Sequence, residues 1–338
     1  RFGKMKARFK PGESYKGVWW CPPCVDVLEA NEIWIVEGIF DALALVHHNI
    51  AAVSAMSSNA FPADSLEALV AARPGNLPKL VWALDNEPGA HAYTKRWVRM
   101  ARELGFNCEA AQIPQRENKK SDWNDLHQRW QFLDEGEKRD AQVDKDLTIA
   151  RHHGALLIAE SATEKALVMF DWKRRSEFHL EFGNRLYWFK LDLEKYNKAI
   201  QELEDSEHHD DQQLNNKQMR AKAMQQCGAL QRIATCNPKA LYYQENKLTD
   251  ESWYYFRITF AHDAAPIKNT FTSSQIASSA EFKKRLLGIA PGGMFTGTTQ
   301  QLDAFIEEQT DALKTVQTID FTGYTREHGA YIYGDVAV

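Results

Sequence analysis

Long hydrophobic runs, a signal peptide and a disulfide framework are all missing from this 338-residue chain. No apolar stretch approaches the roughly 18 residues that a membrane-spanning helix needs, and no segment has the composition of a signal peptide. The five cysteines are an odd number and are scattered, which favours a reducing, cytoplasmic environment over disulfide bonding. The phosphate-loop pattern GxxxxGK followed by Ser or Thr does not occur, so any ATPase would have to lie outside this sequence.

The composition is that of a soluble globular protein, with 44% hydrophobic and 26% charged residues, and the length allows two or three domains. A net charge of −5 does not suggest nucleic-acid binding, but the first ten residues hold five cations, two phenylalanines and no acid. Cations interleaved with aromatic rings suit a phosphate backbone and stacked bases, whereas a solvated terminus is the simpler alternative. These candidate nucleic-acid-binding residues are Arg1, Lys4, Lys6, Arg8 and Lys10.

Strand and helix patterns alternate through the first half of the chain, which is typical of parallel βαβ units. A short β-rich lead-in is predicted over residues 1–30, followed by an α/β domain over residues 31–147. Strands are predicted at 33–37, 51–55, 79–84 and 108–113, and helices at 39–48, 62–72 and 89–104.

The second half of the chain does not continue the regular alternation of strands and helices. It predicts an α+β accessory or connector domain over residues 148–338. Its final run, 319–335, has strand–turn–strand character, and the charge run at 202–211 is interpreted as a solvated loop. Because no closing element is obvious at the end, we expect the chain to be part of something longer. Strands are predicted at 177–190, around 239–245 and at 252–260, and helices at 194–204, 215–233 and 279–288.

Two apolar, strand-like runs end abruptly in carboxylates. Glu37 and Asp41 follow the first run, and Asp85 and Glu87 follow the second. The carboxyl ends of parallel strands converge on the ligand crevice of an open α/β sheet, so these acids are predicted to share one edge. Crowded carboxylates repel one another unless a cation or a proton intervenes, and hard oxygen ligands favour Mg²⁺ or Mn²⁺.

A third acidic segment, from Lys119 to Leu126, follows the fourth predicted strand. Glu-Gly with a following Asp, then Asp-x-Glu, then Lys-x-Asp-Trp-Asn-Asp-Leu, in this order and spacing, resembles a Toprim domain. That domain is the catalytic module of DnaG-type primases, topoisomerases and several nucleases. The version here looks most like the primase Toprim of phage, plasmid and mobile-element replication proteins, and the resemblance covers roughly residues 30–130.

The resemblance implies a set of metal-binding acids and a neighbouring nucleotide site. Glu87 departs from the family's Asp-x-Asp pair, although the longer side chain can still reach a metal. Lys119 and Lys120 are implied to contact nucleotide phosphates, and the basic amino-terminal segment to hold the template. The implied Mg²⁺ or Mn²⁺ ligands are Glu37, Asp41, Asp85, Glu87, Asp122 and Asp125, of which Glu37, Asp85 and Glu87 are the catalytic candidates.

Simpler roles stand beside several of these assignments. Asp122 could cap a short helix, and the two lysines could simply solvate a loop. Cys21 and Cys24 have the spacing of half a zinc site, but no second pair follows at a suitable distance.

The leading hypothesis for function is a DNA primase. It would make short RNA primers on single-stranded DNA from nucleoside triphosphates by two-metal nucleotidyl transfer. Residues 319–335 faintly resemble the segment before the helicase core in primase–helicase proteins, so a replicative helicase is an expected partner in cis or in trans. The alternatives are a metal-dependent Toprim nuclease and a non-catalytic module that positions a helicase on DNA.

Overall fold

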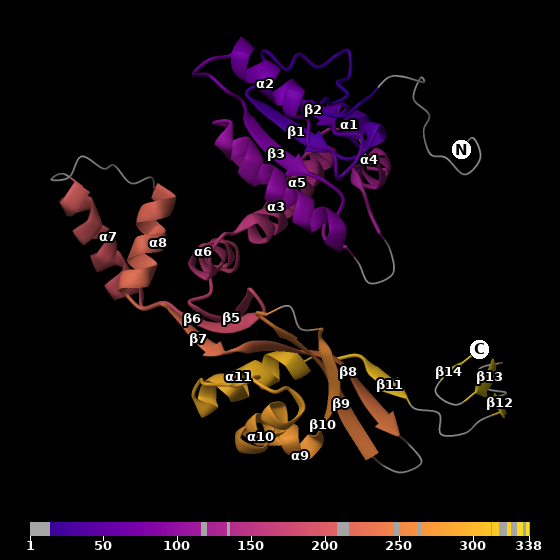
Figure 1. Cartoon of the computed structure of the whole chain (residues 1–338), viewed down its shortest axis with the longest axis vertical. Helices are drawn as coiled ribbons and strands as arrows, with labels where there is room; N and C mark the ends of the chain where they lie inside the picture. Colours follow the sequence, from indigo (N-terminus) through magenta and orange to yellow (C-terminus); the bar gives the residue numbers. More distant parts are fainter. Residues whose placement is uncertain are drawn as a thin grey trace. The chain divides into compact units, whose positions relative to one another are not determined.

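The computed structural model describes residues 14–115, 120–133, 136–207, 216–246, 251–262, 265–311, 313–317, 323–325, 330–333 and 336–337. It divides into two compact units, residues 1–160 and 161–338 (Figure 1). Among the described residues, no helix has both the length and the apolar character needed to cross a membrane.

The first unit is built on a parallel four-stranded sheet with the order β2-β1-β3-β4. The strands are β1 (Glu32–Val36), β2 (Ala52–Ser54), β3 (Lys79–Ala83) and β4 (Cys108–Ala110). The helices are α1 (Ile39–Val46), α2 (Ala63–Ala72), α3 (Pro88–Glu103), α4 (Trp123–Gln131) and α5 (Glu137–Ile158). The predicted parallel sheet flanked by helices is confirmed.

Alternate residues of the two central strands pack into separate cores on opposite faces of this sheet. Ile35 and Trp82 lie in the core that contains α2 and α3. Trp34 and Val81 lie in the core that contains α1, α4 and α5. Strands buried on both faces read as continuous apolar runs, which is why their positions could be predicted closely.

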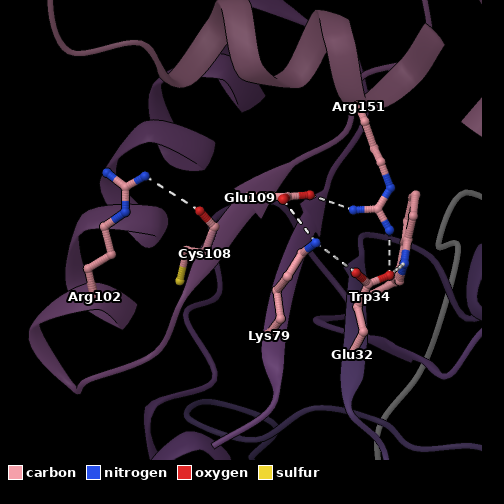
Figure 2. A network of polar contacts seen from close by, with 7 residues as sticks. All are labelled: Glu32, Trp34, Lys79, Arg102, Cys108, Glu109 and Arg151. Atoms are coloured by element: carbon pink, nitrogen blue, oxygen red, sulfur yellow. Dashed lines mark hydrogen bonds and ion pairs between the residues drawn. The ribbon is translucent and has the colours of Figure 1, made fainter. Parts of the chain in front are cut away.

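Helix α5 is fixed to the sheet by a network of charged side chains (Figure 2). Lys79 lies between Glu32 and Glu109, at 3.1 and 2.9 Å, and Arg151 of α5 pairs with the same two glutamates. The Arg151 guanidinium also lies 4.8 Å from the centre of the Trp34 ring. The network joins α5 to three strands, so the first unit extends to Glu160, beyond the predicted domain end at residue 147.

The expected β-rich lead-in is not seen in the residues before β1 that the structure describes. Residues 14–31 contain one isolated bridge, between Trp20 and Ser54, and no named strand. Pro22 and Pro23 cannot donate to a ladder, which disfavours a strand there. The basic residues Arg1 to Lys10 lie outside the described part of the chain.

The second unit mixes helices and strands, as predicted. Its first sheet is antiparallel, with the order β5-β6-β7, and its second has the order β10-β9-β8-β11. The elements up to the second sheet are α6 (Ala162–Lys173), β5 (Glu177–Phe182), β6 (Arg185–Lys190), α7 (Leu193–Glu207), α8 (Asn216–Gln226) and β7 (Leu230–Ala234).

The remaining elements complete the second sheet and a small third one. They are β8 (Cys236–Asn246), β9 (Glu251–Phe260), β10 (Ile267–Thr272), α9 (Ser273–Ala277), α10 (Ser279–Ile289), α11 (Thr299–Thr310), β11 (Thr315–Gln317), β12 (Gly323–Thr325), β13 (Ala330–Tyr333) and β14 (Val336–Ala337). The last three pair antiparallel in the final run, where strands were expected.

Two predictions in this unit were wrong. The helix expected over 215–233 ends at Gln226, because Gly228 adopts a φ of +64° and the chain then enters β7 at Leu230. The charge run expected to be a loop is helical as far as Glu207, the end of α7, where Leu203 is buried in the local core. The rest of that run, 208–211, lies outside the described residues.

Candidate functional site

Glu37 leaves the sheet at the carboxyl end of β1, immediately before α1. The hydroxyl of Ser54 on β2 donates to the Glu37 carbonyl oxygen at 2.8 Å, which fixes this turn from the neighbouring strand. The next residue, Gly38, donates its backbone N–H to Oδ2 of Asp41 at 3.2 Å. A Cβ on Gly38 would lie 2.5 Å from that same oxygen, so glycine is needed here to make room for the carboxylate.

Asp41 connects α1 to α4. Its second oxygen, Oδ1, accepts the backbone N–H of Asn124 at 3.1 Å, and the residue is only 7% exposed. Burial, together with the charge of Asp122, raises the pKa of Asp41 to about 6, against the two backbone hydrogen bonds that lower it. Both oxygens already have backbone partners, so Asp41 positions the α4 segment beside the end of β1.

Asp85 and Glu87 follow β3 at the same edge of the sheet. Between them, Asn86 donates to the Ile113 carbonyl at 2.7 Å, which holds the turn against the segment after β4. Burial and then the carboxylates of Glu37 and other acids raise the pKa of Asp85 to about 7. Glu87 is exposed and its Oε1 lies 2.5 Å from Lys120 Nζ.

The α4 segment brings the third set of acids to this edge. Asp122 caps α4, since its Oδ1 accepts the Asp125 N–H at 2.7 Å. The indole of Trp123 donates to the Ala83 carbonyl at 2.8 Å, at the end of β3. The side chain of Gln115 holds the backbone of Ser121. Its Oε1 accepts the Ser121 N–H at 2.7 Å, and its Nε2 donates to the Ser121 carbonyl at 2.9 Å.

A cavity of about 170 Å³ lies between the second and third sets of acids. Three of its lining residues, Asn86, Gln115 and Ser121, were not identified from the sequence. Asn86 and Ser121 carried a signal, because Asn86 stands between the two acids of its motif and Ser121 between Lys120 and Asp122. The other lining residues are Asp85, Glu87, Lys120, Asp122 and Asp125.

The structure thus gathers the six predicted acids and Lys120 at the carboxyl edge of one sheet, while Lys119 lies outside the described residues. Among the described residues, no group of three or more His, Cys, Asp or Glu side chains is arranged to hold a metal ion as it stands. The chemistry of the donors nevertheless fits a hard cation. They are all carboxylates, and burial followed by their mutual repulsion raises the pKa of Asp85, so a divalent cation would relieve the cost of charging them.

Comparison with known proteins identifies the domain that carries this edge. Residues 34–127 match the family model described as Toprim-like. The first unit therefore contains a Toprim-like domain, and such domains generally bind divalent metal ions.

Among solved structures, the chain is similar to the crystal structure of the RNA polymerase domain of Mycobacterium tuberculosis primase DnaG. The identity is 19% and the TM-score is 0.29; the match covers 42% of this chain and 44% of that one, less than half of its length. No curated protein matches the chain significantly.

Proposed function

We propose that the chain is a primase-type Toprim enzyme, which synthesises short RNA primers on single-stranded DNA by metal-dependent nucleotidyl transfer. The observation that carries the proposal is the convergence of the β1, β3 and α4 acids at the carboxyl edge of a Toprim-like domain. In order and spacing they look most like the primase version of the motif set, from which Glu87 departs.

The acids divide into two roles on the basis of their contacts. Glu37 and Asp85 would be the main ligands for Mg²⁺ or Mn²⁺, with Glu87 beside them, because these three carboxylates follow the carboxyl ends of the two central strands, β1 and β3. When bound, the divalent metals would supply Lewis-acid activation of a 3′-hydroxyl and neutralise a triphosphate. Asp41 and Asp122 hold backbone N–H groups and would support the site.

The cation beside the acids has a role in the same proposal. Lys120 pairs with Glu87 on an exposed part of the site, where exchange of one anion for another costs little. Lys120 would turn to the phosphates of an incoming nucleoside triphosphate. Lys119 and the basic residues Arg1 to Lys10 are proposed to hold nucleotide and template on the strength of the sequence alone.

The partners follow from the reaction. Single-stranded DNA is the template, and nucleoside triphosphates are the substrates. A replicative helicase, with the second unit, residues 161–338, as the connector to it, rests on the sequence resemblance of the final segment alone. The free state of all five cysteines supports a cytoplasmic setting.

The test compares wild type, Glu37→Gln and Glu67→Gln. Glu67 is the matched control. It is an exposed acid on α2, which covers the face of the sheet opposite α1 and α4. Each protein is incubated with single-stranded DNA, labelled ribonucleotides and Mg²⁺ or Mn²⁺. We expect short labelled products with wild type and Glu67→Gln, and at least a hundredfold less with Glu37→Gln, while DNA binding stays nearly unchanged.

Other outcomes would redirect the assignment. Primers from Glu37→Gln at the wild-type rate would remove Glu37 from the site. Shortened template without primers would indicate phosphodiester cleavage. DNA binding with no product under any metal would indicate a non-catalytic module.

A further inference from the structure

The second sheet of the second unit has one covered face and one open face. Helices α9, α10 and α11 lie together on one side of β8, β9 and β10 (Figure 1). Phe256, Ile258 and Phe271 point to that side and pack with Phe282 of α10 and Phe305 of α11. The residues between them in sequence therefore face the other way.

Three cations stand in register across the open face. Lys239 of β8 pairs with Arg257 of β9, and Arg257 pairs in turn with Lys268 of β10. All three are exposed, and none forms an ion pair or a side-chain hydrogen bond with another described residue. Like charges opposite one another on a sheet are destabilising. The three cations therefore lower the stability of this sheet, and a bound anion would remove their repulsion.

Two carboxylates share a cavity with part of this row, and each of them contacts another side chain. Glu181 and Glu308 line a cavity of about 390 Å³ together with Lys239 and Arg257. Glu181 accepts from Lys165 at 3.2 Å, and Glu308 lies 3.0 Å from His179 Nδ1. Neither acid forms an ion pair with Lys239 or Arg257, so the cations of the row have no ion-pair partner among the described residues.

Aromatic rings occupy the next row of the open face. Tyr242 pairs with Tyr255 across β8 and β9, and their rings stack with centroids 4.6 Å apart. Neither ring belongs to the core between the sheet and the helices. Tyr254, the residue before Tyr255 on β9, does pack against that core. Both rings are partly exposed.

The dimensions of the two rows suit a nucleic-acid strand. Neighbouring strands are about 5 Å apart, and residues two apart on a strand are about 7 Å apart. The cations therefore span about 10 Å, and the stacked rings lie about 7 Å to one side of them. Proteins that bind single-stranded nucleic acid combine positively charged side chains along the backbone with aromatic rings on which the bases stack.

We propose that this basic–aromatic face, formed by Lys239, Arg257, Lys268, Tyr242 and Tyr255, binds single-stranded nucleic acid. The cations contact successive phosphates and the outer ring of the tyrosine stack receives an unpaired base. A duplex keeps its bases stacked inside, so it can use the cations but not the rings. The proposal does not depend on which reaction the first unit performs.

The test measures binding of the full chain to a fluorescent oligo-dT, an oligo-rU and a hairpin duplex over about 50 to 200 mM salt. One variant replaces Lys239, Arg257 and Lys268 with Ala. Its control replaces Lys195, Lys198 and Lys284, exposed lysines of the same unit that pair with carboxylates on their own helices or, for Lys195, with Asp192 just before its helix. Both variants lose three positive charges.

We expect the first variant to bind oligo-dT at least about tenfold more weakly. The slope of log K against log salt should fall by about 2, since each single-strand phosphate contact contributes about 0.7. The control should stay within about twofold of wild type. Replacing Tyr242 and Tyr255 with Leu should weaken single-strand binding about fivefold or more with the slope unchanged, and leave duplex binding intact. Comparison of oligo-dT with oligo-rU tells which strand is preferred.

Three results would overturn the proposal. The first is equal binding by the cation variant and its control. The second is an unchanged affinity of the tyrosine variant, which would reduce the face to a general polyanion surface. The third is equal competition by poly-glutamate, which would point to an acidic protein. Circular dichroism of every variant establishes that each is folded, and primer synthesis by the first unit is scored separately.

Discussion

Asp85 is the residue at which the electrostatics of the acidic edge can be measured without assaying any reaction. Burial and neighbouring carboxylates raise its pKa from 3.8 to about 7. Between these two values the folded protein holds a proton that the unfolded chain has released, so the free energy of unfolding falls as the pH rises. The destabilisation is absent below about pH 3.8 and complete above about pH 7.

Replacing Asp85 with Asn removes the charge and keeps the shape of the side chain. A shift of about three units corresponds to about 4 kcal/mol at about 1.36 kcal/mol per unit, which is a ceiling. Because Asp85 is only partly buried, solvent screens much of the repulsion. We therefore expect Asp85→Asn to be about 1–2 kcal/mol more stable than wild type at pH 8, which raises Tm by about 2–8 °C.

Thermal unfolding followed by circular dichroism, without divalent cations, would measure this from about pH 4 to pH 8. The gap in Tm between Asp85→Asn and wild type should be near zero at pH 4 and widen up to about pH 7. Asp144→Asn removes the same charge from an exposed position on α5 and should show no such trend. Millimolar Mg²⁺ should then raise the Tm of wild type at pH 8 more than that of Asp85→Asn.

Two outcomes would refute the reasoning. If Asp85→Asn were no more stable than Asp144→Asn at pH 8, burial and the neighbouring carboxylates would not be disfavouring the charge of Asp85. If the gap were the same at both ends of the pH range, its cause would not be the titration of this group.

Two glycines give sharper steric tests. Gly38→Ala would push a Cβ to within 2.5 Å of Asp41 Oδ2, so we expect about 1 kcal/mol lower stability and at least tenfold slower nucleotide incorporation. Gly89→Ala, with no atom within 4 Å of the new Cβ, should leave both unchanged; equal effects from the two variants would contradict this. Gly154→Ala would place a Cβ 2.0 Å from a backbone oxygen of β4, so α5 must move and chemical unfolding should show a loss of about 1–3 kcal/mol. Gly288→Ala, a helical glycine with open space around it, should be neutral or stabilising by up to about 1 kcal/mol, and a loss as large as that of Gly154→Ala would argue against the steric account.

The sheet of the first unit could be predicted from sequence because its two central strands are buried on both faces. β1 and β3 begin and end within one residue of their predicted positions. The acids were predictable for the same reason, since a buried apolar run that stops at a carboxylate marks the end of a strand. The contact of Asp41 with α4 could not be predicted. It depends on the Asn124 N–H, which lies far along the chain and is brought close only by the fold.

The end of the first unit was misjudged because α5 looks like a solvated charged helix in sequence. Its charges are not all directed to solvent, since Arg151 joins β1 and β4 through Glu32 and Glu109. Gly154 lets the helix approach the backbone of β4 closely. Neither contact produces a recognisable pattern in the sequence near α5. Only the three-dimensional arrangement therefore shows that α5 belongs to the first unit.

Which tyrosine of β8 faces solvent depends on one extra residue. Strict alternation from Lys239 would place Leu241 and Tyr243 on the open face and bury Tyr242. The register instead shifts between Ala240 and Tyr242, so Tyr242 lies opposite Tyr255. No glycine marks this irregularity, and a period-two reading of the sequence assigns the wrong ring to each face. The alignment is set by the apolar residues of β9, which must face the helices. The pairing of cations with stacked rings is therefore a property of the folded sheet, and it could not have been recognised in the sequence of β8 alone.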